Sequence, residues 1–495
     1  MKALRLLAVA ALLAGCGTSV VKHAAAPMPA APQGLQNYYD QHLVWKSCGQ
    51  FRCTKLTVPL DYAHPNGPQI MLAVLKVPAE DQSEKVGALV VNPGGPGGSG
   101  VQFAAEGAGG YFRDALRQHF DIVGFDPRGV GQSAAIDCGN TAQTDAVVST
   151  DPDPSTTAEW TRVNAITRAY LQRCKTMSGD LAGHVSTVEA ARDLDILRAA
   201  LGQAKLDYFG ASYGSFLGAT YAELFPHNVG RMVLDGAIDP ALSTTQMTLQ
   251  QARSMEVALR SYVADCVRGG GCVLGASVDA GIARIQRLLA QIDATPLPTG
   301  SRPLTGALAL YGVWAPLYVR ANWPQLTSAL TEALTLHRGT QLLALADAYV
   351  GRGSRGYLDN SLAAQNAVNC LDRDDYVPWQ RIGALISEFL KASPTFGRDF
   401  ATMLASCQFY PVQTHHKTSA IRAAGAPPIV VIGTTRDPVT PLAWARALAS
   451  QLASGVLITR DGDGHTAYSE GNDCVNDVVE RYLVEGKVPR NGLTC

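Results

Sequence analysis

The sequence predicts an α/β fold, in which a mostly parallel central sheet is flanked by helices and carries an inserted, mainly helical cap. Strand and helix patterns alternate through the first half of the chain, as a parallel sheet requires. This alternation stops near residue 238, where helical patterns take over, and it returns near residue 428. Because strands return, we expect the middle segment to be inserted into one sheet; an independent second domain is the alternative.

The expected strands are short apolar runs, at residues 88–91, 121–125, 206–209, 231–236, 428–433 and 455–459. The expected helices are amphipathic or apolar, at residues 187–201, 215–224, 254–266, 280–292, 326–336 and 381–390. The chain has 495 residues, of which 47% are hydrophobic. This length is enough for one large core and a substantial second unit.

These patterns divide the chain into five parts. The expected boundaries are a signal peptide at 1–15, a flexible tether rich in Ala and Pro at 16–36, the first part of the sheet domain at 37–237, the cap at 238–415 and the second part of the sheet domain at 416–495.

The N-terminus has the pattern of an export signal. Lys2 and Arg5 precede an apolar run that ends at Leu13 and is too short to span a bilayer. The following Ala14-Gly15-Cys16 completes a segment that resembles the lipobox of bacterial lipoproteins. That resemblance implies cleavage before Cys16, lipidation of Cys16 and a chain anchored in the cell membrane on its extracytoplasmic side. An ordinary secretory signal with a coincidental cysteine is the alternative.

The cysteines fit an oxidising compartment. The chain has eleven, so ten remain when Cys16 is set aside, an even number as disulfide pairing requires. Sequence proximity suggests the pairs Cys48 with Cys53, Cys266 with Cys272 and Cys474 with Cys495, with Cys138–Cys174 and Cys370–Cys407 as the remaining bridges. The sequence by itself leaves this connectivity open.

Charge and motif content exclude several functions. The formal net charge is −1 and charged residues make up 17% of the chain, which offers no basic surface for nucleic acid. No C-x-x-C pair or H-E-x-x-H motif is present, and His415-His416 is typical of a solvated loop, so we expect no metal. No cofactor motif is evident either, because the glycine-rich segment at 93–100 lacks the Lys-Ser/Thr of a phosphate-binding loop.

The most informative motif is Gly210-Ala211-Ser212-Tyr213-Gly214, between an expected strand and an expected helix. A G-x-S-x-G sequence at such a junction is the nucleophile elbow of α/β-hydrolases. The glycines permit a sharp turn that presents the serine hydroxyl above the sheet. We therefore predict Ser212 as the nucleophile of a serine hydrolase.

A base and an acid follow in the order that this fold uses. Asp437 and His465 each lie in a loop just after an expected strand. Open α/β sheets bind their ligands at these carboxyl ends of the strands. A carboxylate bound to Nδ1 of His465 leaves Nε2 free to take the Ser212 proton. Asp235 is the rival acid, since it also ends a strand after the elbow. Asp461 and Asp463 are closer to His465 in sequence and look like turn residues.

The glycine-rich segment fits an oxyanion loop. It follows an early strand, and its glycines let backbone amides approach a substrate. The amides of Gly95 and Tyr213 are the predicted oxyanion donors. Arg128, in the Asp126-Pro127-Arg128-Gly129 segment, has two interpretations, a structural partner for a carboxylate or a direct substrate contact; the structural role is favoured.

Together these motifs resemble the proline iminopeptidase and tripeptidyl aminopeptidase group of α/β-hydrolases, over nearly the whole chain from about Trp45 to Cys495. The matching segments are Asn92-Pro93-Gly94-Gly95-Pro96-Gly97, Asp126-Pro127-Arg128-Gly129-Val130-Gly131-Gln132-Ser133, the elbow, Asp437-Pro438-Val439-Thr440-Pro441 and Gly464-His465. The form of the first segment and the lipobox place the chain nearer the secreted tripeptidyl branch.

The resemblance implies a serine aminopeptidase that releases short peptides, tripeptides by preference, from the free N-termini of peptides or proteins. It also implies acidic groups in the cap that hold the substrate ammonium, for which Asp372 and Asp374 are the candidates. A cell-envelope carboxylesterase or lipase would use the same Ser212, Asp437 and His465, so it remains the alternative. A third hypothesis is a binding protein that keeps this fold but has no enzymatic activity. The presence of Ser212, Asp437 and His465 counts against it, because such a protein would not need all three residues.

Overall fold

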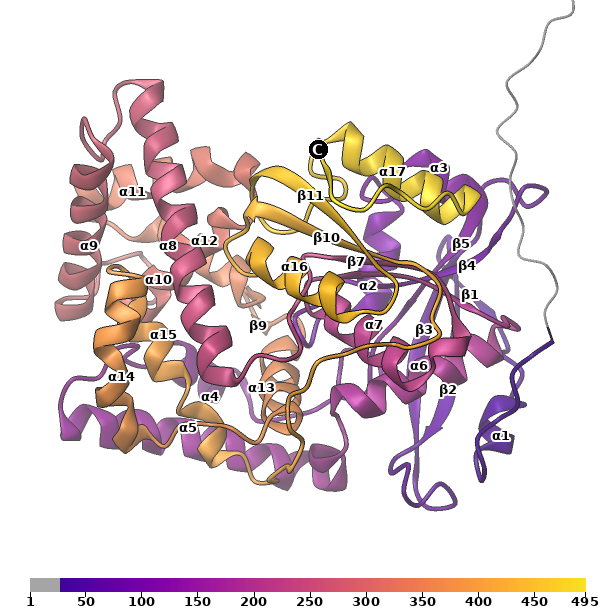
Figure 1. Ribbon diagram of the computed structural model, residues 1–495. Coiled ribbons are helices and arrows are strands. Elements are labelled where there is room, and N and C mark those ends of the chain that lie inside the picture. The colour runs from indigo at the N-terminus through magenta and orange to yellow at the C-terminus, as the bar shows by residue number, and fades with distance from the viewer. Residues whose placement is uncertain (1–26) are drawn as a thin grey trace, which may run out of the picture.

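The computed structural model describes residues 27–495, and ten strands of this part form one twisted sheet (Figure 1). The predicted signal peptide, Cys16 and the tether as far as residue 26 lie outside the described residues. From one edge to the other the sheet comprises β1 (Lys46–Cys48), β2 (Phe51–Pro59), β3 (Gln69–Val77), β5 (Phe120–Phe125), β4 (Gly87–Asn92), β6 (Leu206–Ala211), β7 (Val229–Asp235), β10 (Ile429–Arg436), β11 (Gly455–Asp463) and β12 (Leu493–Thr494).

The sheet is parallel from β5 to β12, and β1, β2 and β3 extend it with antiparallel pairing. The apolar runs at 88–91, 121–125 and 428–433 lie in its buried centre, as predicted. The antiparallel strands were not predicted. β3 does contain an apolar run, at 70–75, that was not identified as a strand. β2 includes Arg52, Thr54, Lys55 and Thr57 and buries only part of its length, so it lacks a continuous apolar run.

Helices cover both faces of the sheet. One face is packed by α2 (Gly100–Gly107), α3 (Asp114–His119) and α17 (Asp473–Glu485), and the other by α6 (Thr187–Ala200), α7 (Tyr213–Leu224) and α16 (Leu442–Gln451). Successive residues of a strand serve opposite faces: Leu89 and Val91 pack with the first layer and Val90 with the second. The short α1 (Gln36–Tyr39) is tied to the second layer, where Tyr39 donates a hydrogen bond to Asp195.

A helical cap with its own apolar core lies between β7 and β10 in the chain and beside the sheet in space (Figure 1). Its core is built from residues such as Leu259, Ile285, Leu326 and Phe389. The elements are α8 (Thr244–Gly269), α9 (Val278–Ala294), α10 (Gly306–Leu317), α11 (Trp323–Leu336), α12 (Thr340–Tyr349), the hairpin β8 (Arg352–Gly353) and β9 (Gly356–Tyr357), α13 (Ser361–Asp372), α14 (Trp379–Ala392) and α15 (Gly397–Met403).

Two helices that precede the elbow also contribute to this cap, although α5 buries Tyr170, Leu171 and Cys174 in the core beside the sheet. Val148 at the end of α4 (Thr141–Val148) lies in the cap core, and Trp160 of α5 (Thr157–Ser178) stacks on Trp379 with ring centroids 5.7 Å apart. The cap is therefore assembled from two separate segments of the chain. The remaining helical turns are short 3₁₀ segments at Gly179–Gly183, Pro226–Asn228, Arg320–Asn322 and Ser406–Phe409.

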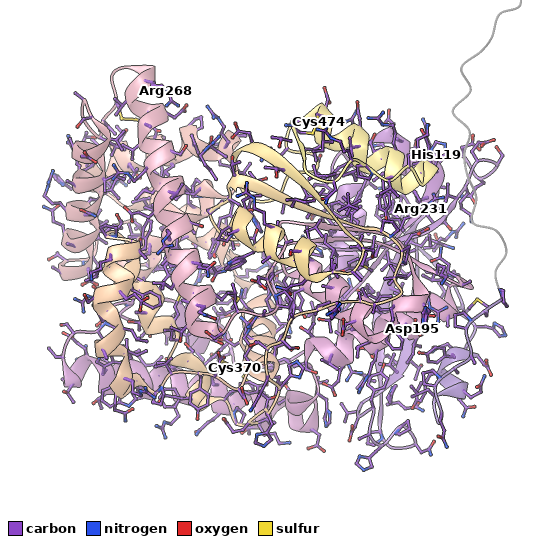
Figure 2. The ribbon with its side chains drawn as sticks, in the orientation of Figure 1. His119, Asp195, Arg231, Arg268, Cys370 and Cys474 are labelled. Carbon is purple, nitrogen blue, oxygen red and sulfur yellow. A yellow bond between two sulfur atoms is a disulfide. The ribbon has the colours of Figure 1, made fainter. Side chains whose placement is uncertain are left out.

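Five disulfides join the ten cysteines. They are the three pairs that sequence proximity suggested, Cys48–Cys53, Cys266–Cys272 and Cys474–Cys495, and the two remaining predicted pairs, Cys138–Cys174 and Cys370–Cys407. Cys370 and Cys474 mark two of these bridges in Figure 2. Within residues 27–495, every helix is too short or too polar to cross a bilayer.

Arg128 is a structural residue. Its guanidinium is buried and binds Asp193 through two nitrogens, each 2.7 Å from a carboxylate oxygen. The same side chain donates to the carbonyl oxygens of Pro59, Leu60 and His184. All its donors thus bind groups in the protein interior. This agrees with the structural role, and not with a direct contact to substrate.

Candidate active site

Ser212 occupies a sharp turn between β6 and α7. Its backbone has φ 56° and ψ −125°, a conformation that non-glycine residues rarely adopt and that marks a functional turn. The flanking glycines are required by close packing: a Cβ on Gly210 would collide with the carbonyl oxygen of Gly214, and one on Gly214 would lie 2.7 Å from the carbonyl oxygen of Asn92. The side chain of Ser212 is consequently presented at the carboxyl end of the sheet.

Asp437 and His465 meet at the carboxyl ends of β10 and β11. Nδ1 of His465 lies 3.0 Å from each carboxylate oxygen of Asp437. The Asp437 side chain is fully buried and accepts backbone N–H groups of Val439, Thr440 and Thr466 at 2.8, 2.8 and 3.1 Å. This geometry fixes the imidazole with Nε2 as the nitrogen available for proton transfer.

The imidazole of His465 is tuned towards a stronger base. Burial lowers its pKa, but the charge of Asp437, the hydrogen bond to it and the charge of Asp235 together outweigh burial, so the pKa of His465 is raised. A general base has to be neutral to accept a proton. We therefore expect activity on the alkaline side of the ordinary histidine range.

Asp235, the rival acid, does not bond to His465. Its Oδ2 accepts the backbone N–H groups of Ala467 and Tyr468 at 3.0 and 2.8 Å, and its buried Oδ1 has no partner within the described residues. Burial raises the pKa of this carboxyl to about 6. The geometry thus selects Asp437 as the partner of His465 and gives Asp235 the task of holding the loop that follows His465.

Ser212 and His465 flank the turn at the end of β7. The Ser212 amide donates to the carbonyl oxygen of Asp235 at 2.8 Å, and a Cβ on Gly236 would lie 3.3 Å from Cε1 of His465. The structure records no hydrogen bond between the Ser212 hydroxyl and the imidazole. Such bonds are often long in substrate-free enzymes and shorten when substrate binds. The three predicted catalytic side chains are therefore gathered at one edge of the sheet.

The predicted oxyanion loop lies directly against the elbow. A Cβ on Gly94 would lie 2.8 Å from Cβ of Ser212 and 2.9 Å from the amide nitrogen of Tyr213. This contact places the predicted oxyanion loop, in which the Gly95 amide comes next, beside the amide of Tyr213. Neither amide donates a hydrogen bond to another group in residues 27–495, so both remain available to a developing oxyanion.

The cap reaches the catalytic edge from two sides. The carbonyl oxygen of Tyr318 accepts the His465 amide at 2.7 Å, and the Tyr318 ring packs edge-on against the imidazole with centroids 5.5 Å apart. On the other side, a Cβ on Gly97 of the oxyanion loop would collide with the carbonyl oxygen of Ser361 at the start of α13. The cap thus contacts the catalytic edge both at His465 and at the oxyanion loop.

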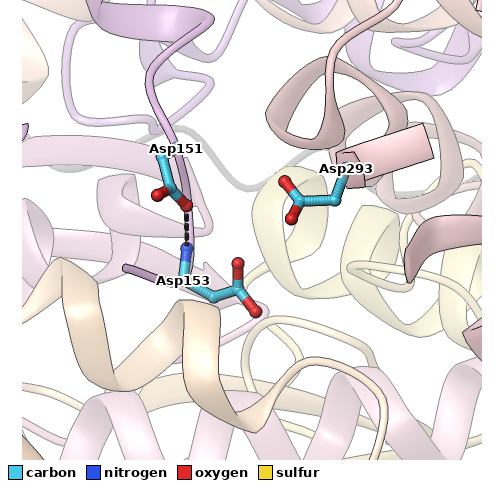
Figure 3. A group of neighbouring side chains, drawn as sticks. All are labelled: Asp151, Asp153 and Asp293. Carbon is cyan, nitrogen blue, oxygen red and sulfur yellow. Dashed lines mark hydrogen bonds between the residues drawn. The ribbon is translucent and has the colours of Figure 1, made fainter. Parts of the chain in front are cut away.

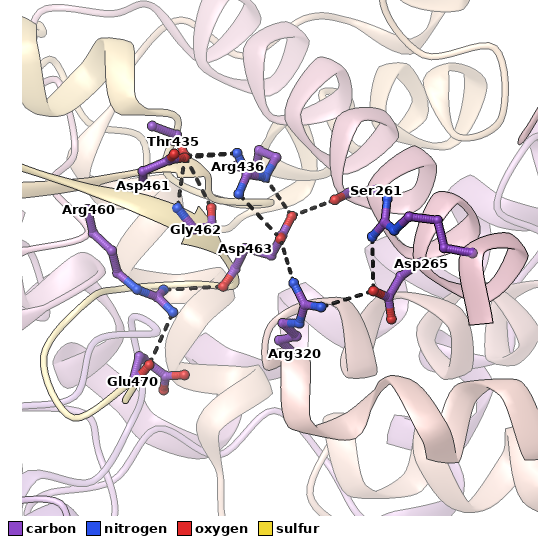
Figure 4. A network of polar contacts seen from close by, with 11 residues as sticks. Ser261, Asp265, Arg320, Thr435, Arg436, Arg460, Asp461, Gly462, Asp463 and Glu470 are labelled. Atoms are coloured by element: carbon purple, nitrogen blue, oxygen red, sulfur yellow. Dashed lines mark hydrogen bonds and ion pairs between the residues drawn. The ribbon is translucent and has the colours of Figure 1, made fainter. Parts of the chain in front are cut away.

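A polar network joins the cap to the loop that carries His465 (Figure 4). Asp463 accepts hydrogen bonds from Ser261 of α8 at 2.6 Å, from Arg436 at 2.8 Å and from Arg320 at 3.3 Å. Burial raises the pKa of Asp463, but these donors and charges outweigh it, so the net shift is downward. Asp463 is therefore a buried bridge between domains, whereas Asp461 lies exposed beside Arg436.

Two residues of this site were not predicted from the sequence. The Thr440 hydroxyl donates to Oδ2 of Asp437 at 2.9 Å and lies 3.3 Å from Nδ1 of His465. Tyr318 reaches His465 from the cap, far away in the chain. Thr440 has a local clue, since it follows the acid by three residues as capping side chains do; for Tyr318 no pattern connects it to the catalytic loops.

Asp372 was predicted to bind a substrate amine, but its carboxylate binds Thr187 inside the protein. Its two carboxylate oxygens accept the backbone N–H and the hydroxyl of Thr187 at 2.7 and 2.6 Å, and only 5% of the residue is exposed. Burial raises its pKa to about 6. Asp372 consequently ties α13 to the start of α6. The Asp374 amide donates to the carbonyl oxygen of His416, and no contact brings the Asp374 side chain to Ser212 or His465.

Comparisons with known proteins find relatives that match most of the chain. Residues 393–495 match the family described as TAP-like protein. Serine protease Hip1 of Mycobacterium tuberculosis is 37% identical over 99% of this chain and 96% of its own length. Carboxylesterase B of the same species is 38% identical over 91% of this chain and 89% of its own length. Tripeptidyl aminopeptidase of Streptomyces lividans is 31% identical over 91% of this chain and 84% of its own length.

Among solved structures, proline iminopeptidase of Mycobacterium smegmatis is similar over 87% of this chain and 98% of its own, with a TM-score of 0.36 and 14% identity.

Proposed function

Because this chain belongs to the α/β-hydrolase family that includes serine protease Hip1 and tripeptidyl aminopeptidase, we propose that it is a serine aminopeptidase that releases short peptides, by preference tripeptides, from free N-termini. The observation that carries the proposal is the buried Asp437–His465 pair beside the strained Ser212 turn and two unpaired amides.

These residues account for acyl transfer. His465 Nε2 takes the Ser212 proton while Oγ attacks the scissile carbonyl carbon, and Asp437 stabilises the imidazolium that forms. The carbonyl oxygen gains negative charge beside the amides of Gly95 and Tyr213. Protonated His465 then gives its proton to the leaving amine, and an acyl-enzyme remains on Ser212. A water molecule, deprotonated by the same imidazole, releases the peptide.

The position of the cap supports an exopeptidase. Tyr318 covers His465, and the start of α13 covers the oxyanion loop, so the cap contacts the site on both of its flanks. A polypeptide that crossed the site in mid-chain would have to leave on both sides of Ser212. Cap contacts on both flanks of the site therefore favour the end of a chain over its middle.

A series of substrates that differ in length and in their N-terminus tests this function. We expect the fluorescent-amine conjugate of Ala-Ala-Ala to be hydrolysed at least about 100-fold faster, in kcat/KM, than the conjugates of Ala and of N-acetyl-Ala-Ala-Ala, because remote binding energy is lost in both. The measurement is initial rates with the purified protein. Equal hydrolysis of the acetylated tripeptide would contradict an aminopeptidase and indicate an endopeptidase.

A carboxylesterase is the second candidate, and the 38% identity to carboxylesterase B favours it. The catalytic residues would be the same, so the two candidates differ only in the substrate that the cap admits. p-Nitrophenyl butyrate belongs in the same assay. Faster turnover of this ester than of any peptide conjugate, with no effect of peptide length, would favour the esterase.

We propose further that the protein is anchored to the cell membrane through lipidated Cys16 and faces the extracytoplasmic side. The lipobox-like sequence and the five disulfides support this location. We expect Cys16→Ala to abolish incorporation of a clickable fatty acid and to reduce the membrane-bound fraction, with Cys48→Ala as a control that retains the label. Equal labelling of the Cys16→Ala variant would contradict the anchor.

A further inference from the structure

A cavity of about 210 Å³ lies between α5, α10, α13 and α15. Most of its lining is apolar or aromatic and includes Trp160, Leu310, Tyr311, Trp314 and Phe409. Side-chain amides interrupt these walls, among them those of Asn164 and Gln365. Apolar walls with a few polar groups are typical of a cavity that binds a small ligand or part of a larger one.

One wall of the cavity, α13, also contacts the oxyanion loop. Leu362 and Gln365 of this helix line the cavity. The same turn of the helix packs on Gly97, where a Cβ would collide with the carbonyl oxygen of Ser361 and would lie 3.2 Å from the backbone nitrogen of Gln365. The cavity and the oxyanion loop therefore lie against the same turn of α13.

This wall begins a short distance from the nucleophile. The Gly98 amide donates to the carbonyl oxygen of Gly94 at 3.1 Å, so Gly94 and Gly97 belong to one tight turn. Gly94 packs on Ser212 and Gly97 packs on α13. Because a turn of this kind spans less than about 7 Å, the wall lies roughly 10 to 15 Å from Ser212. An extended tripeptide spans about 10 Å.

A second wall, α10, leads to the general base. Tyr311 of this helix lines the cavity and stacks on Tyr349, with ring centroids 5.5 Å apart. The Tyr349 hydroxyl lies 3.1 Å from that of Tyr318, whose ring packs against the imidazole of His465. The walls of the cavity thus include both parts of the cap that contact the catalytic edge.

Asn164 is the residue that points to a ligand. It lines the cavity from α5, and only 9% of it is exposed. Its carboxamide makes no hydrogen bond within the part of the chain that the structure describes. A buried amide without a partner is costly, because it has lost its hydrogen bonds to bulk water. A carboxamide donates and accepts, so it is complementary to the carbonyl and N–H groups of a peptide main chain.

The charge of the lining determines which ligands the cavity disfavours. Asp151 and Asp399 belong to the lining, whereas no cationic side chain of residues 27–495 does. Asp153 and Asp293 lie beside Asp151, and one carboxylate oxygen of each of these three lies within 4.8 Å of the others (Figure 3). Arg398 is a countercharge, 4.0 Å from Asp153. The remaining negative charge opposes an acidic ligand and permits a neutral apolar one.

We propose that this cavity binds the side chain of the substrate's N-terminal residue, that it prefers an apolar side chain, and that the Asn164 carboxamide bonds to the main chain beside it. The inference rests on the proposed aminopeptidase function and adds a side-chain preference to it. In an extended tripeptide the N-terminal residue lies about 7 Å beyond the residue at Ser212. Its side chain is therefore the one that reaches the cavity.

Three conjugates with the same fluorescent amine test the preference: Leu-Ala-Ala, Ala-Ala-Ala and Glu-Ala-Ala. We expect kcat/KM for Leu-Ala-Ala to exceed that for Ala-Ala-Ala at least about tenfold, because the cavity buries the larger apolar side chain. Glu-Ala-Ala should be the poorest of the three. The amides of the same tripeptides should bind the Ser212→Ala variant in the same order of affinity, measured by isothermal titration calorimetry.

Asn164→Leu tests the carboxamide, because it replaces that group with an apolar one of similar size. We expect KM for Leu-Ala-Ala to rise about fivefold, more than kcat falls, since a hydrogen bond to the bound substrate is lost. The midpoint of thermal unfolding should stay the same or rise, because an unpaired polar group is removed. Asn369→Leu is the matched control: Asn369 is exposed on α13 and outside the lining, so its variant should behave as the parent does.

Thr167→Phe tests the cavity itself. Thr167 lines it from α5, and a phenylalanine at this position fills part of the space that the substrate side chain would occupy. We expect the ratio of kcat/KM between Leu-Ala-Ala and Ala-Ala-Ala to fall below about twofold. A loss of folded protein would lower both values together and would leave this ratio unchanged.

Equal kcat/KM and equal affinity for the Leu and Ala tripeptides would overturn the inference. So would a preference for Leu that both Thr167→Phe and Asn164→Leu retain, since another surface would then hold the side chain. Failure of the proposed function looks different: no tripeptide conjugate is hydrolysed, or the acetylated one is hydrolysed equally well. In that case the affinities for the Ser212→Ala variant still decide the inference, because they need no turnover.

Discussion

Ser212→Ala is expected to lower kcat by roughly 10⁶-fold, because it removes the only atom that forms the acyl-enzyme. The midpoint of thermal unfolding should change little, since the Ser212 hydroxyl makes no hydrogen bond in the structure. The measurement is steady-state hydrolysis of the best of the peptide conjugates described above, together with thermal unfolding of the same preparation.

Ser387→Ala provides the matched control, because Ser387 is an exposed serine on helix α14 of the cap. It should retain full activity. If the Ser212→Ala variant kept activity comparable to this control, a nucleophile at position 212 would be ruled out.

Asp437→Asn is expected to lower kcat by roughly 10⁴-fold, because an amide in place of the carboxylate no longer favours the tautomer and charge that His465 needs. Asp235→Asn tests the rival acid. An asparagine oxygen at 235 can still accept the amides of Ala467 and Tyr468, so we expect less than about a tenfold loss. The reverse order of effects would transfer the role of the acid to Asp235.

The pH profile separates an effect on His465 from simple misfolding. In the parent, kcat/KM should fall as pH decreases through the pKa of His465, which lies above the ordinary value of 6.5 because Asp437 stabilises the protonated ring. In Asp437→Asn the residual activity should fall at a lower pH, since that stabilisation is gone. An unshifted profile would mean that Asp437 does not act through His465.

The sheet strands and the nucleophile were predictable because their signals are local. The apolar runs at 88–91 and 428–433 identify strands that are buried on both faces. The glycines of the elbow identify the turn, since only a residue without Cβ fits at positions 210 and 214. The antiparallel strands β1 to β3 were not predicted. β1 and β2 mix polar and apolar residues, and the apolar run at 70–75 in β3 was not identified as a strand.

The sequence did not reveal which contacts each candidate aspartate makes. Asp235 ends β7 and Asp437 directly follows β10, and only the orientation of their side chains decides that Asp437 contacts His465. Asp372 lies in an acidic segment that is typical of an exposed surface. In the structure it is buried and accepts a hydrogen bond from Thr187 of α6. The assignment of α4 and α5 to the cap also depends on packing, through Trp160 and Trp379.

The sequence by itself determined the α/β architecture, the inserted cap, the candidate nucleophile, acid and base and the order in which they occur, because periodicity and turn chemistry act over a few neighbouring residues. Tertiary structure alone decided which carboxylate meets His465, how Tyr318 covers it and how Asp151, Asp153 and Asp293 converge. These contacts join residues that are far apart in the chain, and their distances arise only when the sheet and the cap pack together.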